Sequence, residues 1–238
     1  TNGGSSWTNI VTGLPAQTSA NSPWVAPIVQ HPTQANTYYC GYKQVYKSTN
    51  QGSSWTQIGS IGTNLDRIKI APSNTNVIYV TASGAIYKTL NDGGSWSNVT
   101  GSIPVGLASI TDVTVDNLNE NIVYVSLSGY SAGNKVYQST DGGATWSNYS
   151  TGIPNLPTQS IVYKNNSNNA IYLGTDNGVF YRDGSMSSWI PYNNGLPNIE
   201  VSDLEIYYPT GKLRAATYAR GVWETDVFSN PSSVPAAA

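Results

Sequence analysis

Ser139-Thr140-Asp141-Gly142-Gly143-Ala144-Thr145-Trp146 is the stretch of sequence that decides the fold. An Asp side chain can hydrogen-bond the backbone amides of its own turn, and a glycine takes a positive φ without strain. The hydroxyl residue at the start adds a further local bond, and the Trp at the end folds back onto the hairpin. The stretch therefore predicts a structural turn between two short strands.

Related turns recur along the chain. Trp follows Trp at steps of 48, 41, 50 and 43 residues, although the turn before the fifth, Trp189, has lost its other residues. Three of the turns carry Asn where Asp141 stands, and a catalytic or metal-binding role would need the charge. We expect these turns only to stabilise their hairpins. Their residues are Asn2, Gly4 and Trp7; Ser48, Asn50, Gly52 and Trp55; Thr89, Asn91, Gly93 and Trp96; and Ser139, Asp141, Gly143 and Trp146.

Three short apolar strands precede each later turn, and a fourth follows its Trp. In the third repeat these are Val113-Thr114-Val115, the stretch that Asn121 introduces, and Val136-Tyr137, before the strand after Trp146. Four strands in each ~40–50 residues are typical of a β-propeller blade. We predict an all-β chain, a propeller of about five four-stranded blades over residues 1–228, followed by a Ser/Pro/Ala linker or tail over residues 229–238.

The ends of the repeats leave two possibilities open. Residues 5–11 supply only an outermost strand, and residues 222–227 end on the third strand of a fifth unit. The first possibility is that residues 5–11 pair with residues 222–227 and complete the last blade. The second is that the chain is a piece of a larger propeller.

The composition excludes several classes of function. The net charge is −2 and only 10% of the residues are charged, against about a quarter in an average globular domain. No basic surface is available for nucleic acid, and no apolar run approaches a membrane span. The single Cys40 reads as a small buried hydrophobe, and His31 has no assigned role. We expect a secreted or cell-surface bacterial protein, with no metal and no cofactor.

The turns resemble Asp-box, or bacterial neuraminidase, repeats. Sialidases, sortilin-type receptors and xyloglucanase-type glycoside hydrolases carry such repeats. The stretches Trp24-Val25-Ala26-Pro27 and Tyr218-Ala219-Arg220-Gly221-Val222-Trp223 look like repeats in exoproteins of polysaccharide-degrading bacteria. The resemblance covers nearly the whole chain, but it is specific for architecture and not for function, because the family mixes enzymes, receptors and assembly factors.

Three functions follow from this resemblance. The first is a non-catalytic or accessory module of a secreted carbohydrate-active protein, whose partner is a polysaccharide or another secreted or cell-surface protein. The second is a glycoside hydrolase of the xyloglucanase type, or a part of one, which would need two carboxylates across a cleft. The third is a receptor-like propeller that binds peptide. A sialidase is disfavoured, because the chain has four arginines and no arginine-bearing opening motif.

The candidate ligand-binding residues are those of the loops that enter the innermost strands. Three acids stand at a similar place in their repeats, just before the innermost strand, and could converge at one mouth of the channel. They are also the weak candidates for catalysis, and the alternative is that they bond backbone amides of a neighbouring blade. A tryptophan on such a loop offers a ring for a sugar face, unless it packs between blades. The residues are Trp24, Asn64, Asp66, Asp112 and Asp203.

Overall fold

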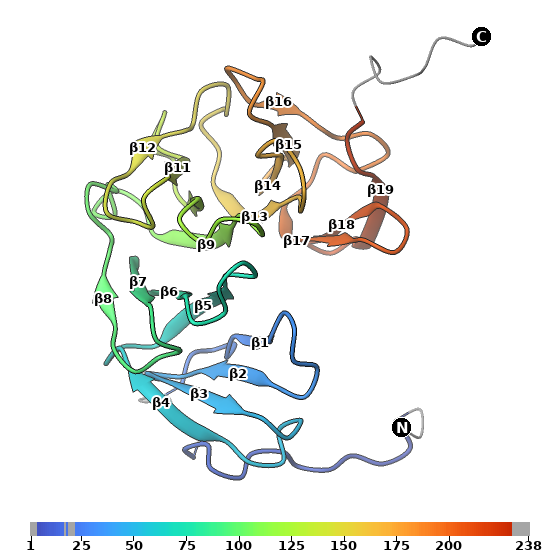
Figure 1. The fold of residues 1–238 in the computed structure, drawn as a ribbon. Helices are drawn as coiled ribbons and strands as arrows, with labels where there is room; N and C mark the ends of the chain where they lie inside the picture. Colours follow the sequence, from blue (N-terminus) through green and yellow to red (C-terminus); the bar gives the residue numbers. More distant parts are fainter. Residues whose placement is uncertain (1–3, 17, 19–21, 230–238) are drawn as a thin grey trace, which may run out of the picture. The chain divides into compact units, whose positions relative to one another are not determined.

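The computed structural model describes residues 4–16, 18 and 22–229. Within these residues the chain forms strands and turns, and no helix (Figure 1). Asn2 of the first predicted turn, and residues 230–238 of the predicted tail, lie outside the described residues. The all-β prediction is confirmed.

The strands form five sheets, and each sheet consists of strands that follow one another in sequence. We call these sheets blades 1 to 5 (Figure 1). Blade 1 contains β1 (Ile28–Gln30), β2 (Tyr38–Gly41), β3 (Gln44–Ser48) and β4 (Thr56–Ser60). Blade 2 contains β5 (Leu65–Ile70), β6 (Ile78–Ala82), β7 (Ala85–Thr89) and β8 (Ser97–Asn98). Blade 3 contains β9 (Ile110–Val115), β10 (Val123–Leu127), β11 (Val136–Ser139) and β12 (Ser147–Asn148). Blade 4 contains β13 (Thr158–Tyr163), β14 (Ile171–Thr175), β15 (Gly178–Arg182) and β16 (Ile190–Pro191), and blade 5 contains β17 (Val201–Tyr207), β18 (Lys212–Thr217) and β19 (Gly221–Asp226).

The chain divides into two compact units. Unit 1 comprises Thr1–Val105, Val115–Val123 and Ser139–Trp146, and unit 2 comprises Gly106–Thr114, Tyr124–Gln138 and Ser147–Ala238. Each unit has an apolar core where consecutive blades meet. In unit 1 one such core contains Tyr39, Val45, Leu65, Ile68, Ile70, Ile78 and Val80. In unit 2 one contains Ala170, Tyr172, Val179, Tyr181, Leu196, Val201, Leu204, Ile206, Leu213 and Ala215.

The second strand of each blade shows how its faces are covered. β6, β10 and β14 are buried at every residue, and their sequences are almost continuously apolar. A strand buried on both faces has no reason to alternate. β18 reads Lys-Leu-Arg-Ala-Ala-Thr, and only every second residue is buried. One face of blade 5 therefore packs on its neighbour in unit 2, and the other face is polar and open.

The predicted turns are held by their own side chains. The Asp141 carboxylate accepts the Thr145 backbone amide at 2.8 Å and the Ser139 hydroxyl at 2.8 Å. The Ser139 hydroxyl oxygen accepts the Gly143 amide at 2.8 Å, and Gly143 has φ +93°. Bonds from Thr145 and Ser139 lower the pKa of Asp141 to about 2. Asn50 and Asn91 accept the equivalent amides in their turns, each at 2.9 Å.

Each turn also fastens one repeat to the one before it. The Trp55 indole N–H donates to the carbonyl of Ile10 at 2.8 Å, and the Trp146 indole N–H donates to that of Val99 at 2.7 Å. Both acceptors lie three residues after the Trp of the preceding repeat. The Trp is therefore a link between repeats as well as the seal of its own hairpin.

The fifth blade has the three strands that its own repeat predicted, and residues 5–11 contain no strand. Of the two possibilities that the ends of the repeats left open, the pairing of residues 5–11 with residues 222–227 is not formed in the described residues. The N-terminal segment bonds to the turn of blade 1. The carbonyl of Thr12 accepts the Trp55 backbone amide at 2.9 Å, beside the Ile10 bond described above. In the described part of the chain β19 pairs only with β18.

Candidate functional site

Trp24 lies in the loop before β1, and its side chain is fully exposed, at 102% of the reference area. The neighbouring Val25 is also exposed. Within unit 1, Trp24 is therefore not packed between blades. A tryptophan side chain is well buried on average, so the full exposure of Trp24 is unusual.

Asn64 joins this loop to blade 2 within unit 1. Its side-chain Nδ2 donates to the carbonyl of Ser22 at 3.2 Å, two residues before Trp24. Its Oδ1 is buried and has no hydrogen-bond partner within the described residues. The structure thus brings Trp24 and Asn64 into the same region.

Asp66 occupies a β-bulge in β5, the extra residue where the register shifts between Leu65 and Arg67. Its Oδ2 accepts the Ser83 amide at 3.2 Å. Desolvation of its carboxyl raises the pKa of Asp66, and the Ser83 amide and the Arg67 charge oppose that rise. Asp66 belongs to unit 1, like Trp24 and Asn64.

Asp112 and Asp203 belong to unit 2 and stand one register place later than Asp66. Asp112 directly precedes Val113, whose amide it accepts at 2.8 Å, and Asp203 directly precedes Leu204, whose amide it accepts at 3.0 Å. The sequence placed all three acids at one position, and this is wrong for Asp66. Asp66 is itself the extra residue of the bulge in β5, whereas Ser202 is the extra residue of the bulge in β17 and Asp203 follows it. The three acids do not form one site within either unit.

The second oxygen of Asp112 confirms the structural alternative for that residue. It accepts the Ile161 amide of β13 at 3.0 Å, so the carboxylate bonds the backbone of the next blade. Asp203 instead lines a shallow pocket of about 130 Å³ on the open face of blade 5. The sequence did not single out the other lining residues, and the alternation along β18 is the signal that could have found them. They are Glu205, Arg214, Ala216 and Val222.

Arg214 is one of two cations on this open face. Its Nε donates to a Glu224 carboxylate oxygen at 2.9 Å, and its guanidinium lies 4.0 Å from the centre of the Tyr207 ring. Lys212 pairs with Asp226 at 2.7 Å on the same face. The face is thus acidic at its two outer strands and basic along β18.

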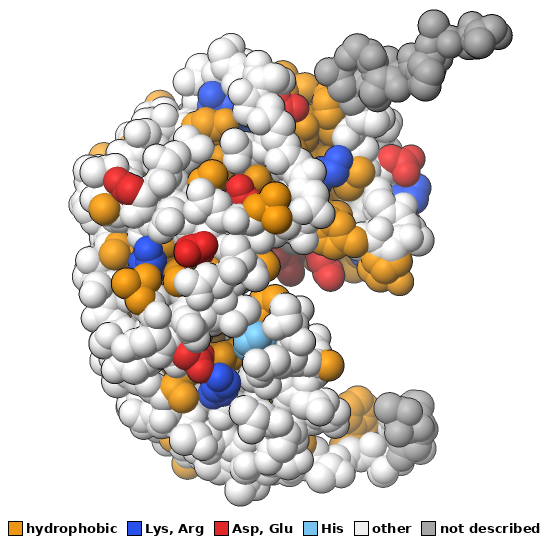
Figure 2. Space-filling model, in the orientation of Figure 1, with side chains coloured by type: hydrophobic (Ala, Val, Ile, Leu, Met, Phe, Trp, Pro, Cys, Tyr) orange, Lys and Arg blue, Asp and Glu red, His pale blue; other side chains and the backbone are white. Residues whose placement is uncertain are grey.

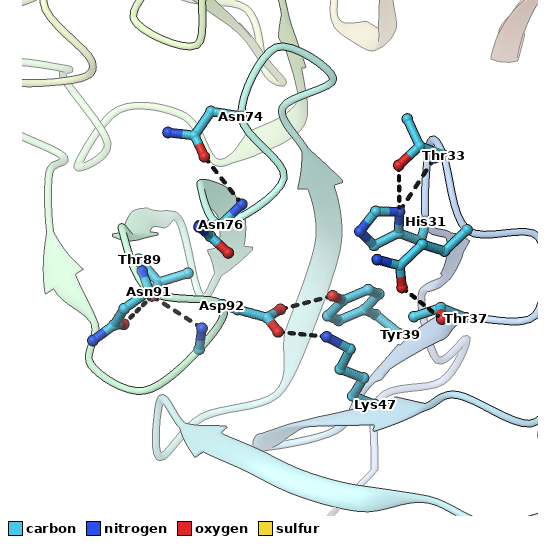
Figure 3. Close-up of polar contacts among 12 residues, drawn as sticks. His31, Thr33, Thr37, Tyr39, Lys47, Asn74, Asn76, Thr89, Asn91 and Asp92 are labelled. Carbon is cyan, nitrogen blue, oxygen red and sulfur yellow. Dashed lines mark hydrogen bonds and ion pairs between the residues drawn. The ribbon is translucent and has the colours of Figure 1, made fainter.

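A second polar cluster lies in unit 1 around Asp92, the residue after Asn91 in the turn of blade 2 (Figure 3). Asp92 has φ +55° and points to blade 1. Its carboxylate accepts the Tyr39 hydroxyl at 2.7 Å and pairs with the ammonium of Lys47. The Lys47 ammonium also lies 5.2 Å from the centre of the Tyr39 ring. The cluster ties two blades together, and the sequence analysis did not find it.

His31 stacks on Tyr39 at the edge of this cluster, with ring centres 6.3 Å apart (Figure 3). The ring is buried, and its Nδ1 accepts the Thr33 amide at 3.2 Å. Burial, and then the charge of Lys47, lower the pKa of His31, against the opposing charge of Asp92. These contacts describe a neutral imidazole that serves as an acceptor.

Charged side chains are sparse on the surface that Figure 2 shows, and most of it is formed by uncharged polar side chains and backbone. Among the described residues no group of three or more His, Cys, Asp or Glu side chains could hold a metal ion. No helix in the described part of the chain is long and apolar enough to cross a membrane.

Comparison with protein families and sequences gives two matches. The family model of Sortilin-Vps10, described as sortilin, neurotensin receptor 3, matches residues 43–173, more than half of the chain. A xyloglucanase of a Paenibacillus species is 25% identical over 229 residues, which cover 84% of this chain. The chain spans only 20% of the length of that relative.

Comparison with solved structures places the fold among propellers. The GH74 xyloglucanase from Xanthomonas campestris superposes with a TM-score of 0.64 at 16% identity, over 84% of this chain and 36% of that one. The β-propeller domain of Cps50 (Swd1) from Myceliophthora thermophila gives a TM-score of 0.66 at 11% identity, over 88% of this chain and 69% of that one. These similarities show the propeller architecture that the repeats predicted.

Proposed function

This chain belongs to the Sortilin-Vps10 family, and on that premise we propose that it is a non-catalytic, glycan-binding module of a secreted or cell-surface carbohydrate-active protein. Its similarity to a xyloglucanase supports the carbohydrate part of this proposal. The low charge and the polar, uncharged surface support an extracellular setting. Xyloglucan, the substrate in the name of that relative, is the first polysaccharide to test.

The observation that carries the proposal is the full exposure of Trp24. An indole ring offers a flat apolar face, and binding sites combine such surfaces with a few well-placed polar groups. Asn64 fixes the loop, since its Nδ2 donates to the carbonyl of Ser22, while its Oδ1 is buried. The carboxylate of Asp66, in the same unit, is the acceptor that we assign to sugar hydroxyls.

The arrangement of the carboxylates is the reason to propose binding without catalysis. Glycosidases place two carboxyl groups on either side of the bond that they cleave. Asp203 and Glu205 line one pocket, but they stand two residues apart on one face of β17. Both therefore lie on one face of a single strand and not on opposite walls of a cleft.

The proposal is tested by native gel electrophoresis in gels that contain xyloglucan or another soluble polysaccharide. We expect the polysaccharide to retard the wild-type chain, and Trp24→Ala to weaken binding by at least about tenfold, or 1.4 kcal/mol. The melting temperature should hardly change, since an exposed side chain contributes little to packing.

Trp7→Ala is the matched control, because Trp7 is another tryptophan of unit 1 that is 89% exposed. It should bind polysaccharide as the wild type does. Equal retardation of Trp24→Ala and the wild type would overturn the site, and so would a Trp7→Ala variant as weak as Trp24→Ala.

A glycoside hydrolase, or a part of one, is the second candidate, and the 25% identity to a xyloglucanase is the observation that favours it. Because the chain spans a fifth of that relative, it could supply one side of a cleft. This candidate predicts reducing ends released from the polysaccharide, whereas the first predicts binding alone.

A further inference from the structure

The connection between the second and third strands is longer in blade 3 than in the other blades. In blade 3 it covers residues 128–135, between β10 and β11, and we call this segment the blade 3 loop. The same connection covers residues 42–43 in blade 1, 83–84 in blade 2, 176–177 in blade 4 and 218–220 in blade 5. Because about two to five residues are enough to close a hairpin, the additional residues of blade 3 are not needed to join its strands.

Polar groups of its own hold the blade 3 loop in one shape. The Lys135 side chain is fully buried, and its ammonium donates to the carbonyl of Gly129 at 2.6 Å. The Asn134 Nδ2 donates to the Ser131 hydroxyl oxygen at 3.0 Å, and its Oδ1 accepts the Tyr137 hydroxyl at 2.7 Å. A buried ammonium is costly unless it is hydrogen-bonded, so Lys135 fixes the carbonyl that it binds. The loop is therefore preorganised for a ligand.

A second loop adjoins the blade 3 loop within unit 2. It is the last part of the connection between β8 and β9. The Ser128 amide donates to the carbonyl of Ser109 at 2.9 Å, and the Ser109 amide donates to the Ser128 hydroxyl oxygen at 3.1 Å. A Cβ added at Gly129 would lie 3.6 Å from the carbonyl oxygen of Leu107. Leu107 and Tyr130 thus stand on two loops that touch each other.

Each of these loops presents an apolar side chain to solvent. Tyr130 is 69% exposed, and Leu107 is 68% exposed. Residues 101–109 and 128–134 contain no charged side chain, and their polar side chains are hydroxyls and one amide. The cation of the blade 3 loop, Lys135, is buried and bonded. The two loops therefore offer an aromatic ring and an aliphatic side chain among uncharged hydrogen-bonding groups.

We propose that these two loops form a second contact with a neutral polysaccharide, in which the Tyr130 ring stacks on a sugar ring. A sugar ring has an apolar face and uncharged hydroxyls, which match an aromatic ring with hydroxyl and amide groups beside it. An acidic polymer would find no cation to pair with on these loops. The inference rests on the proposed function for the class of ligand, but the contact uses neither Trp24 nor Asp66.

Retardation in gels that contain xyloglucan tests the role of the ring. Tyr130→Ala should weaken binding by about fivefold or more, as the truncation of a central aromatic contact does. Tyr130→Phe keeps the ring and should bind nearly as the wild type does. Tyr218→Ala is the matched control, because Tyr218 is also 69% exposed and also belongs to unit 2. Equal retardation of Tyr130→Ala and the wild type would overturn the proposal, and so would a Tyr218→Ala variant as weak as Tyr130→Ala.

Cysteine labelling tests where the polysaccharide lies. In a Cys40→Ala background, Ala132→Cys places an exposed thiol in the blade 3 loop and leaves Tyr130 intact. Xyloglucan should slow the reaction of this thiol with a maleimide several-fold. It should not slow the reaction of Thr210→Cys, which places a thiol in an exposed turn of the same unit. An Ala132→Cys thiol that reacts equally fast with and without xyloglucan contradicts the proposal.

The gels also separate failure of this contact from failure of the proposed function. A wild-type chain that no polysaccharide retards rules out both. Weak binding by Trp24→Ala together with full binding by Tyr130→Ala rules out the blade 3 contact alone. The converse result supports the blade 3 contact and rules out the Trp24 site.

Discussion

At the residue scale, a few polar side chains hold the turns of the hairpins. Asp141, Asn50 and Asn91 accept equivalent backbone amides, so the turn needs an oxygen acceptor and not a charge. This much followed from the sequence, because the bonds are local. The network of Asp92 with Tyr39 and Lys47 did not follow from the sequence, because Asp92 lies 53 residues after Tyr39 and 45 residues after Lys47.

His31 makes the stability of the chain depend on pH. The folded state lowers the pKa of His31 below the value near 6.5 that an unfolded chain shows, so the unfolded state binds the proton first. The contribution of His31 to the free energy of unfolding is therefore fully present above about pH 6.5, and it is lost as the pH drops below that value. Melting temperatures from pH 7.5 to pH 5 should show this fall.

His31→Asn should reduce that dependence, since its side-chain oxygen can still accept the Thr33 amide but does not titrate. A wild-type chain and a His31→Asn chain with the same pH profile would show that another group is responsible.

At the scale of the element, the outer strand of one repeat is held by the turn of the next. Val99 and Tyr149 lie three residues after Trp96 and Trp146, and their carbonyls accept the next indole N–H, from Trp146 and Trp189, each at 2.7 Å. Trp96 departs from this rule, because its indole N–H is buried without a partner in the described residues. The residue that should accept it, Ile58, is the extra residue of a bulge in β4. Strands and turns were predictable from periodicity, but bulges depend on pairing and were not.

Trp146→Phe and Trp96→Phe form a matched pair of substitutions. Trp146→Phe leaves the Val99 carbonyl without its donor, whereas Trp96→Phe removes an indole N–H that has no acceptor. Trp146→Phe should therefore destabilise the chain by about 1–2 kcal/mol more than Trp96→Phe. Urea unfolding measures the difference, and equal losses would show that the indole bond contributes nothing.

At the scale of the whole molecule, the repeats predicted a propeller, and similarity to solved propellers shows it. The sequence also predicted five blades and the three strands of the fifth repeat, but not the open polar face of that blade. β18 did contain that signal, since its Lys-Leu-Arg-Ala-Ala-Thr alternates where β6, β10 and β14 do not. The candidate ligand residues lie in two units of the chain. Residues at similar places in different repeats therefore need not share a site.

One incubation tests the central claim of glycan binding without cleavage. The chain is incubated with a soluble polysaccharide, and both the fraction of protein bound and the reducing ends released are measured over time. We predict that protein is bound in proportion to polysaccharide and that reducing ends stay at the level of the polysaccharide alone. Release that grows with the amount of protein would contradict the account, and so would the absence of binding to every polysaccharide tested.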